Sequence, residues 1–475
     1  MCWIVWFTFK DTKLLEHLSS SLQSRAVDSQ SSYVDQDISI FHAHLKISDL
    51  DKDTKQPFIN DEIILAFVGE IYNTDFFIKR LKLSQDATES EIISMAYKKY
   101  GPDFVQYLNG EFCICIFDRK NKKLCLFRDR YGVKNLYYTV KNKELYFSSE
   151  IKSLVDPHTI ISKIWEEMYR IFLYTLDPYT LFENIFTLEP WWYLTFEKWK
   201  IVKAPFAPFV FQEDKSTFIS SLEKAVTRRI PKYQSKILLS LSGGIDSTII
   251  LYFLKKLYPG KIVTYSLLSD KNTQEIEIAV QNARKFEVEH CIIDMRKYSF
   301  EAYFKKNVLR HEGLVYCPDF IALLKENFPH VNDIKVEFAW DGKEELFLVN
   351  THFAYERIEK EFKESHLKNI FWENFTPTQK FLNLSLFSYN LQLGEKITLG
   401  NWVERRLPFT DYELMKYSGD AHYKSEMVKI LQKENIFVSQ EKYGYNAWLN
   451  FQVFQWKDLT KHLAKYLQIF QNYNA

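Results

Sequence analysis

The sequence predicts two domains of different fold class, a β-rich first domain with a few helices and a second domain in which strands alternate with helices. Three observations lead to this expectation. Short apolar runs separated by turn residues fill roughly the first 200 residues. Proline and aromatic residues break that pattern over 203–209. From Lys236 onward, strand and helix patterns alternate, which is typical of a parallel α/β sheet.

The length and composition indicate a folded protein with more than one core. A chain of 475 residues is too long for a single core and should divide into two or three domains. Its 62 basic side chains balance 61 acidic ones, which leaves a formal charge of +1. Because this charge supplies no field that would attract nucleic acid or an anionic membrane, we expect neither as a partner.

The cysteines and the apolar runs favour a soluble, cytoplasmic protein. The six cysteines include no CxxC pair and are sparse for the length, so we expect reduced thiols and neither a disulfide framework nor a zinc site. The N-terminal stretch MCWIVWFTF lacks a basic leader and a cleavage site, which favours a strand over a signal peptide. No apolar run reaches the ~18 residues that a membrane span needs.

Periodicity gives the expected elements and domain boundaries. In the first domain we expect a helix over 89–100 and a sandwich of two sheets. A second amphipathic helix is expected over 217–229, after the break in pattern. The boundaries are therefore drawn as a first domain at 1–202, a linker at 203–216 and a second domain at 217–475. The strands expected in the first domain are 2–9, 38–47, 63–68, 111–118, 123–128, 135–139 and 144–149.

A strand, a glycine turn and a helix start coincide in the stretch KILLSLSGGIDST, residues 236–248. Residues 237–239 suit a buried strand, 242–244 form a turn and 249–257 predict a helix. Two adjacent glycines let the backbone approach an anion, and the free N–H groups of a helix start attract negative charge. No GKS or GKT follows, so the loop is not of the Walker type. An ordinary strand-to-helix turn with a Ser cap is the alternative.

This loop resembles the SGGxDS loop of the ATP pyrophosphatases, which bind the pyrophosphate of ATP while a carboxylate or carbonyl takes the AMP. The resemblance implies that Asp246 also helps to bind Mg2+. The nucleotide-binding residues that it implies in this loop are Leu241, Ser242, Gly243, Gly244, Asp246 and Ser247.

Cys2 would become an N-terminal nucleophile if the initiator Met were removed, because its free amine could then take the proton of its thiol. A cysteine at this position is by itself more often a packing residue. Four stretches, at 66–73, 108–112, 128–138 and 147–152, resemble in order the motifs of the glutaminase domain of asparagine synthetase. The asparagine synthetase resemblance then covers most of the chain. It implies an α+β N-terminal-nucleophile (αββα) glutaminase-like domain followed by an α/β ATP pyrophosphatase synthetase domain.

Three residues depart from the family pattern around the glutamine site. Trp3 stands where the family has Gly, and Val68 replaces an Asn whose amide stabilises the oxyanion. The loss of one such donor typically costs a factor of about 10²–10³ in rate. His44 replaces an Arg that clamps the glutamine carboxylate, and a neutral imidazole cannot reproduce a bidentate guanidinium. We therefore expect glutamine hydrolysis to be weak or absent.

The alternative is that Cys2 remains a working nucleophile. In that case the resemblance implies Gly69 as the remaining oxyanion donor, with Glu70 in the same motif. Glu89 stands near the position of an Asp that holds the ammonium of glutamine.

The resemblance also extends to the end of the second domain. Residues 338–347 match the position of the family's SGxGxDELFGGY loop, which implies Glu344 as a Mg2+ ligand, Asp341 near the acyl-adenylate and Gly342 at the nucleotide. Its altered ends predict a reshaped substrate pocket. The KYGY stretch implies that Lys442 stabilises negative charge in both half-reactions.

Together these implications describe an ATP- and Mg2+-dependent, AMP- and pyrophosphate-forming ligase that joins a small-molecule or peptide carboxylate to an amine or ammonia. Three alternatives stay open: an intramolecular cyclase similar to the β-lactam synthetases or lasso-peptide cyclases, a glutamine-hydrolysing asparagine synthetase, and a non-catalytic scaffold. The sequence does not name the substrates, and a homodimer is compatible with it.

Overall fold

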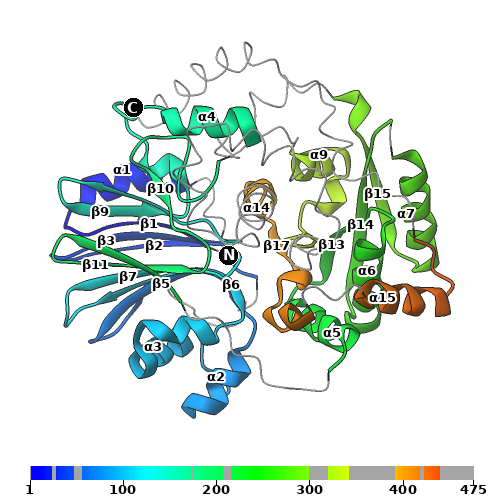
Figure 1. The fold of residues 1–475 in the computed structure, drawn as a ribbon, viewed down its shortest axis with the longest axis horizontal. Helices are drawn as coiled ribbons and strands as arrows, with labels where there is room; N and C mark the ends of the chain where they lie inside the picture. The colour runs from blue at the N-terminus through cyan, green and yellow to red at the C-terminus, as the bar shows by residue number, and fades with distance from the viewer. Residues whose placement is uncertain are drawn as a thin grey trace. The chain divides into compact units, whose positions relative to one another are not determined.

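The computed structural model describes residues 2–23, 28–47, 56–172, 175–206, 216–270, 272–298, 319–341, 391–417 and 422–438. The described residues up to 206 belong to one compact unit, and those of 216–341 and 393–438 belong to a second. Each unit has its own sheets and helices (Figure 1).

The described part of the first unit contains two six-stranded antiparallel sheets. One has the strand order β10-β8-β9-β1-β3-β2 and the other β12-β11-β7-β6-β5-β4. The first consists of β1 (Cys2–Phe7), β2 (Ser29–Val34), β3 (Ser39–His44), β8 (Tyr137–Lys141), β9 (Glu144–Ser148) and β10 (Phe186–Thr187). The second consists of β4 (Phe58–Ile59), β5 (Ile63–Ile71), β6 (Gly110–Asp118), β7 (Lys123–Arg128), β11 (Trp192–Glu197) and β12 (Lys200–Pro205).

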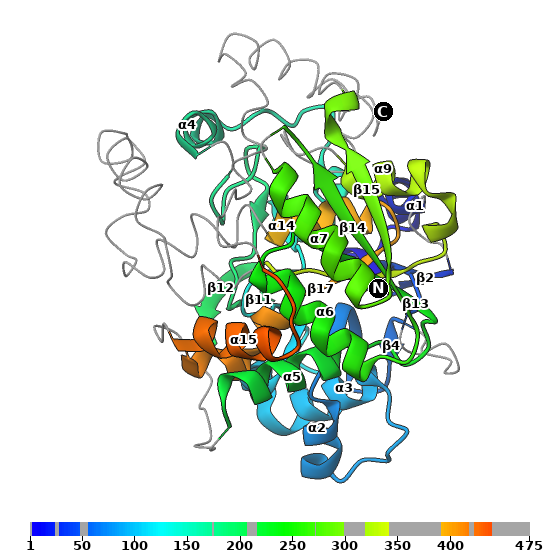
Figure 2. The same cartoon turned by 90° about the vertical axis from the view of Figure 1, so that its right-hand side faces the viewer.

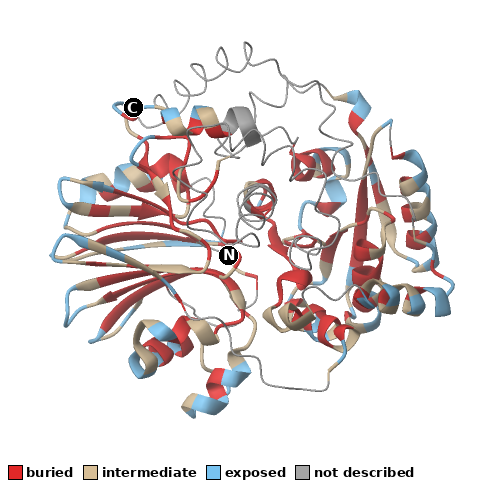
Figure 3. Ribbon diagram, viewed as in Figure 1, coloured by how far each residue is buried: buried red, intermediate tan, exposed pale blue. Residues whose placement is uncertain are grey.

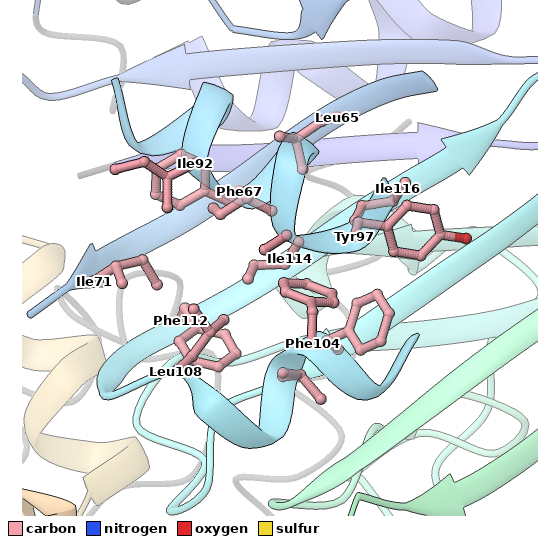
Figure 4. Close-up of a cluster of buried hydrophobic side chains, with 14 of the residues drawn as sticks. Leu65, Phe67, Ile71, Ile92, Tyr97, Phe104, Leu108, Phe112, Ile114 and Ile116 are labelled. Atoms are coloured by element: carbon pink, nitrogen blue, oxygen red, sulfur yellow. The ribbon is translucent and has the colours of Figure 1, made fainter. Parts of the chain in front are cut away.

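Helices cover the outer face of each sheet in this unit. Leu65 and Phe67 alternate along β5 and pack against Ile92 in a cluster between the sheet and α3 (Glu89–Tyr100) (Figure 4). The first sheet carries α1 (Thr12–Gln23) against β1 and β3, while β1 contacts β5 in the other sheet. The layers therefore run helix, sheet, sheet, helix, and the αββα fold expected from the sequence is confirmed. The other helices are α2 (Thr74–Leu81), η1 (Gly101–Tyr107), η2 (Ile151–Leu154) and α4 (Lys163–Phe172).

The bounds of α3 and β7 agree with expectation. Five of the strands described in the first unit were not expected, namely β2, β4, β10, β11 and β12. Among them, β2 reads SQSSYV. This edge strand has no apolar alternation, and only its pairing with β3 makes it a strand. The pairing of β12 with β11 continues to Pro205, so the segment expected as a linker from 203 begins inside a strand.

The second unit is built on a parallel sheet with the strand order β15-β14-β13-β16-β17 among its described residues. The strands are β13 (Lys236–Ser240), β14 (Lys261–Leu268), β15 (Glu289–Asp294), β16 (Val336–Phe338) and β17 (Glu404–Arg406). The interior residues of β13 are all buried, as expected for a strand covered on both faces (Figure 3). The α/β class expected for this domain is confirmed.

Helices lie on both faces of this sheet. Both α7 (Thr273–Lys285) and α9 (Phe320–Asn327) contact β15, and they lie on opposite sides of it (Figures 1 and 2). This follows from right-handed crossovers, because the chain moves outward from β13 to β15 and then returns to the other side of β13 to form β16. The other helices are α5 (Phe218–Arg229), α6 (Ile245–Leu257), η3 (Met295–Lys297), η4 (Pro329–Val331), α14 (Gln392–Leu399), η6 (Pro408–Thr410), η7 (Tyr412–Tyr417) and α15 (His422–Lys433).

A membrane-spanning helix is not found in the part of the chain that the structure describes, because no helix there is both long enough and apolar enough.

Candidate functional site

The glycine loop lies at the point where the strand order of the parallel sheet reverses. β13 has β14 on one side and β16 on the other, and the loop 241–244 follows the carboxyl end of β13. Ligands of open α/β sheets bind at such a point because the two flanking connections leave in opposite directions. The fold therefore places the stretch singled out from the sequence at the expected position for a ligand.

Gly243 is required by the shape of this loop. Its φ angle is +76°, and a Cβ atom added there would lie 2.3 Å from the carbonyl oxygen of Glu275 and 3.1 Å from the amide nitrogen of Ala279. Both of these residues belong to α7, so the absence of a side chain lets α7 pack directly on the loop.

The serines and the helix start give the loop its hydrogen-bonding groups. Ser247 Oγ accepts from the Ser242 amide at 3.1 Å and lies 3.1 Å from Ser242 Oγ, which in turn accepts from the Gly244 amide at 3.3 Å. Gly244 is the N-cap of α6 and forms no side-chain cap, so the alternative of a Ser-capped turn is not what the structure has. The N–H groups of the first turn are left to attract an anion.

The helix after the loop begins earlier than expected. The sequence predicted a helix from 249, whereas α6 begins at Ile245, directly after the loop. Glycine and serine residues hide the start of a helix from a pattern of apolar residues, and Gly244 in an extended conformation ends the loop abruptly. Asp246 and Ser247 therefore lie within the first turn, where the helix dipole favours negative charge.

Three side chains around the loop could complete a binding site. Asp246 is buried, with 6% of its surface exposed. The hydroxyl oxygens of Ser240 and Thr248 are buried and make no hydrogen bond with any described residue. A buried hydroxyl without a partner is costly, so these two positions are polar groups that the described residues leave unsatisfied. Neither Ser240 nor Thr248 was singled out from the sequence, since a single hydroxyl residue carries no pattern.

A hydrogen-bonded pair of side chains supports the loop from β14 and β15. Ser266 Oγ donates to the carbonyl oxygen of Leu241 and lies 3.2 Å from His290 Nε2. The other ring nitrogen of His290, Nδ1, lies 2.9 Å from Thr264 Oγ1, so both ring nitrogens contact hydroxyl groups of β14. Burial lowers the pKa of His290 to about 4 and keeps the imidazole neutral.

Asp341 lies in a buried group of charges beside the loop. Asp341 follows β16, and its Oδ2 atom lies 2.5 Å from Arg405 Nη2. On the same guanidinium, Arg405 Nε lies 3.7 Å from Glu337 Oε2. Glu337 also accepts from the Tyr265 hydroxyl. Burial raises the pKa of Glu337. The arrangement holds Asp341 in a fixed orientation at the same edge of the sheet as the glycine loop.

Three residues expected at this site, Gly342, Glu344 and Lys442, lie outside the described residues. Of the expected set, the structure describes the loop residues 241–247 and Asp341, and it brings them to the carboxyl ends of the adjacent strands β13 and β16.

In the first unit, the structure brings Gly69, Glu70 and Glu89 close together. Gly69 has a φ angle of +118°, and a Cβ atom there would lie 1.9 Å from the carbonyl oxygen of Glu111. Glu70 is the next residue of β5 and pairs with Glu111 across the sheet. Glu89 Oε1 accepts the amide hydrogen of Ile71 at 2.7 Å. The three glutamine-site candidates are thus neighbours at one end of β5.

Cys2 is the first residue of β1, and its backbone lies opposite His44 of β3. His44 therefore stands beside the candidate nucleophile, at the position that the resemblance assigns to an Arg. Trp3 has 1% of its surface exposed and Val68 has 2%, so both belong to the packed interior. The burial of Trp3 in the packed interior is sufficient to explain why a large side chain occupies position 3. The Cys2 side chain lies outside what the structure describes.

The motif at 128–134 has a structural role. Arg128 donates to the carbonyl oxygens of Gly132, Lys134 and Leu188 and pairs with Asp177 at 3.0 Å, with no exposed surface. A fully satisfied buried guanidinium fixes the fold of a loop rather than its chemistry.

Two family models match the chain. The model described as a glutamine amidotransferase domain matches residues 1–207. The model described as asparagine synthase matches residues 217–325, which include the glycine loop.

Curated relatives carry names of the same kind. Amidase chry2 of Gibberella zeae is 26% identical over 65% of this chain and 51% of its own length. Glutamine-hydrolyzing asparagine synthetase 1 of Bacillus subtilis is 27% identical over 72% of this chain and 56% of its own length. Asparagine synthetase 3 of the same organism is 22% identical over 90% of this chain and 82% of its own length. The match thus spans about half the length of the first two relatives.

Proposed function

Because the chain belongs to the asparagine synthetase family, we propose that it is an ATP-dependent ligase that forms an amide bond and releases AMP and pyrophosphate. The observation that carries this proposal is the loop 241–247 at the strand-order reversal, with its uncapped helix start and its glycine at positive φ. A carboxylate is the group to be activated, and an amine or ammonia is the nucleophile.

The loop would hold the two outer phosphoryl groups of ATP. The backbone N–H groups at the start of α6 and the hydroxyls of Ser242 and Ser247 supply donors for phosphate oxygens. Asp246 and Glu344 would hold Mg2+, which prefers carboxylate and phosphate oxygens and would neutralise charge on the departing pyrophosphate.

The proposed reaction has two steps that share one site. A carboxylate oxygen forms a bond to the α-phosphorus while the bond to the bridging oxygen breaks, and pyrophosphate leaves with that electron pair. The amine nitrogen then bonds to the acyl carbon, loses a proton, and displaces AMP. Lys442 would stabilise the negative charge that develops in each step, and Asp341, held by Arg405, would orient the acyl group.

Exchange of labelled pyrophosphate into ATP in the presence of candidate carboxylates tests this proposal. We expect Asp246→Asn to abolish exchange, because the variant loses a metal ligand while its size is unchanged. Asp333→Asn is the matched control, since that carboxylate is 62% exposed and pairs only with Lys236 among described side chains. Exchange that persists in Asp246→Asn, or that is not detected with any carboxylate, would overturn the proposal.

We propose that the source of the amine is a molecule other than glutamine. The Val68 side chain supplies no donor for an oxyanion, and the His44 imidazole cannot form a bidentate clamp on a carboxylate. Free ammonia, a small amine or an amine within the substrate itself, as in an intramolecular cyclase, fits these residues better. Glutamate release from glutamine that disappears in Cys2→Ala would contradict this and would support a working glutaminase.

We also propose a cytoplasmic location and a domain boundary between Pro205 and Thr217. Burial supports free thiols at each cysteine whose side chain is described, and β12 ends at Pro205 while Thr217 caps α5. The thiols in question are those of Cys113, Cys115, Cys125 and Cys291.

A further inference from the structure

Three side chains of different chemistry meet on the second unit, away from the glycine loop. Glu289, Cys291 and His330 each direct one potential ligand atom to a common point, and these atoms lie within 4.8 Å of one another. We name them the β15 cluster. They belong to two elements that are distant in sequence, β15 and the short helix η4.

The geometry of the strand explains how the cluster forms. Glu289 and Cys291 are two residues apart in β15, so their side chains lie on the same face of the sheet. On this strand α9 packs against the sheet, and η4, which follows α9, supplies His330. The cluster is thus produced by a packed helix and not by a local sequence motif.

The β15 cluster is separated from the glycine loop by β14 and by the plane of the sheet. In the parallel register, Glu289 is level with Leu238 and Cys291 is level with Ser240. His290, which contacts Ser266 below the loop, alternates with Glu289 and Cys291 along β15, so the side chains of these two residues lie on the opposite face from His290. The β15 cluster therefore shares no residue with the proposed Mg2+ site.

Although the spacing of the cysteines predicted no zinc site, we propose that Glu289, Cys291 and His330 bind a late first-row divalent cation of the Zn2+ class. A thiolate, an imidazole and a carboxylate are the three ligand types that Zn2+ takes in proteins, and three protein ligands with a fourth position open to water or substrate are typical of its catalytic sites. Mg2+ and Ca2+ prefer oxygen ligands alone, so sulfur and nitrogen favour the softer cations.

The existing contacts of the cluster are compatible with coordination. Glu289 Oε2 pairs with Lys261 Nζ at 2.6 Å, and the other carboxylate oxygen contacts His330 Nε2. A cation between Glu289 Oε1 and His330 would leave the Lys261 pair intact and would need the imidazole to move outward. The His330 side chain is 49% exposed, so it has room to do so and leaves the fourth position open to water.

The Cys291 thiol must lose its proton to become a ligand. This thiol is buried and makes no hydrogen bond with a described residue, and burial raises its pKa to about 11. Binding therefore releases a proton, and the cation should bind more tightly as the pH rises. The metal would tie the edge strand β15 to η4, which raises the stability of this side of the sheet.

Titration of the full chain with Co2+ tests the proposal, because a thiolate bound to Co2+ gives a charge-transfer absorption in the near ultraviolet. We expect this absorption to saturate at one equivalent and Zn2+ to remove it. Cys291→Ser should abolish it, and His330→Ala should weaken Co2+ binding at least about tenfold. His158→Ala, at an exposed histidine of the first unit, is the matched control and should bind like the wild type.

Circular dichroism will show whether the variants are folded. If Cys291→Ser is unfolded, His330→Ala decides the question, because its side chain is half exposed and its loss should not unfold the sheet. A charge-transfer band that survives in Cys291→Ser, an unchanged affinity in His330→Ala, or the absence of any Co2+ or Zn2+ binding by equilibrium dialysis would overturn the proposal. These measurements do not depend on ATP and are independent of the proposed ligase activity.

Discussion

Two glycines, one in each unit, hold similar backbone geometry in different chemical surroundings. Gly243 has a φ angle of +76° and contacts the Glu275 carbonyl, and Gly69 has a φ angle of +118° and contacts the Glu111 carbonyl. Around Gly243 lie hydroxyls and the start of α6, whereas Gly69 lies between the buried, apolar Val68 and Glu70, which pairs with Glu111. A backbone shape that only glycine permits therefore occurs beside different polar groups in the two units, and those groups decide which chemistry is possible.

The largest expected effect comes from Gly243→Ala. A methyl group 2.3 Å from the Glu275 carbonyl would push α7 off the loop, and displacement of a binding group by about 1 Å can cost 10²-fold in rate. We expect pyrophosphate exchange to fall at least about 10²-fold. Gly101→Ala is the control, because Gly101 has a φ angle of +59° and nothing within 4 Å of an added Cβ. Exchange that falls equally in both variants would mean that a general loss of folded protein, and not the contact with α7, is responsible.

The second prediction concerns His290, which supports the loop through Ser266. Its folded pKa of about 4 lies below the ordinary value of about 6.5, so the unfolded chain takes up a proton first as the pH falls. The resulting stability is present above pH 6.5 and is lost between about pH 6.5 and 4, by at most about 3 kcal/mol. Urea unfolding at both ends of this range should show a smaller loss in His290→Gln than in the wild type. Equal losses in the two proteins would contradict the assignment.

The third prediction is that Ser247→Ala weakens the loop without unfolding it. The variant removes the acceptor of the Ser242 amide, and a hydrogen bond of this kind is worth about 1 kcal/mol. We expect a loss of roughly tenfold in exchange, mainly through the KM for ATP, because the same hydroxyl is proposed to contact phosphate. Ser425→Ala on an exposed part of α15 should leave exchange unchanged. An unaltered KM in Ser247→Ala would remove this hydroxyl from the proposed site.

The smallest expected effect is in the region of Gly69. Glu89→Ala removes the acceptor of the Ile71 amide and should lower the free energy of unfolding by about 1 kcal/mol. Glu89→Gln keeps an acceptor oxygen and should remain close to the wild type. Both variants should retain pyrophosphate exchange, which belongs to the second unit. A large loss of exchange in Glu89→Ala would show that the two units are coupled in function.

Sequence reasoning found the residues that short contiguous motifs contain. The glycine loop, its aspartate and the candidates Gly69 and Glu70 lie in consecutive stretches, so their positions could be recognised without coordinates. Spacing did not indicate the contacts that Glu275, Ser266 and Arg405 make, because each reaches its partner from a different strand or helix. The expected roles of Glu344 and Lys442 stay predictions.

The amino-acid sequence alone determined the β-rich class of the first domain and the α/β class of the second, because the periodicity of apolar residues indicates which faces of each element must be buried. It also predicted that a glycine turn follows the strand at 236–240. Only the tertiary structure decided that this turn meets α7, that Asp341 is held by Arg405, and that Cys291 faces His330. These contacts join residues far apart in sequence, and no local pattern encodes them, since the strand order of the sheet brings them together.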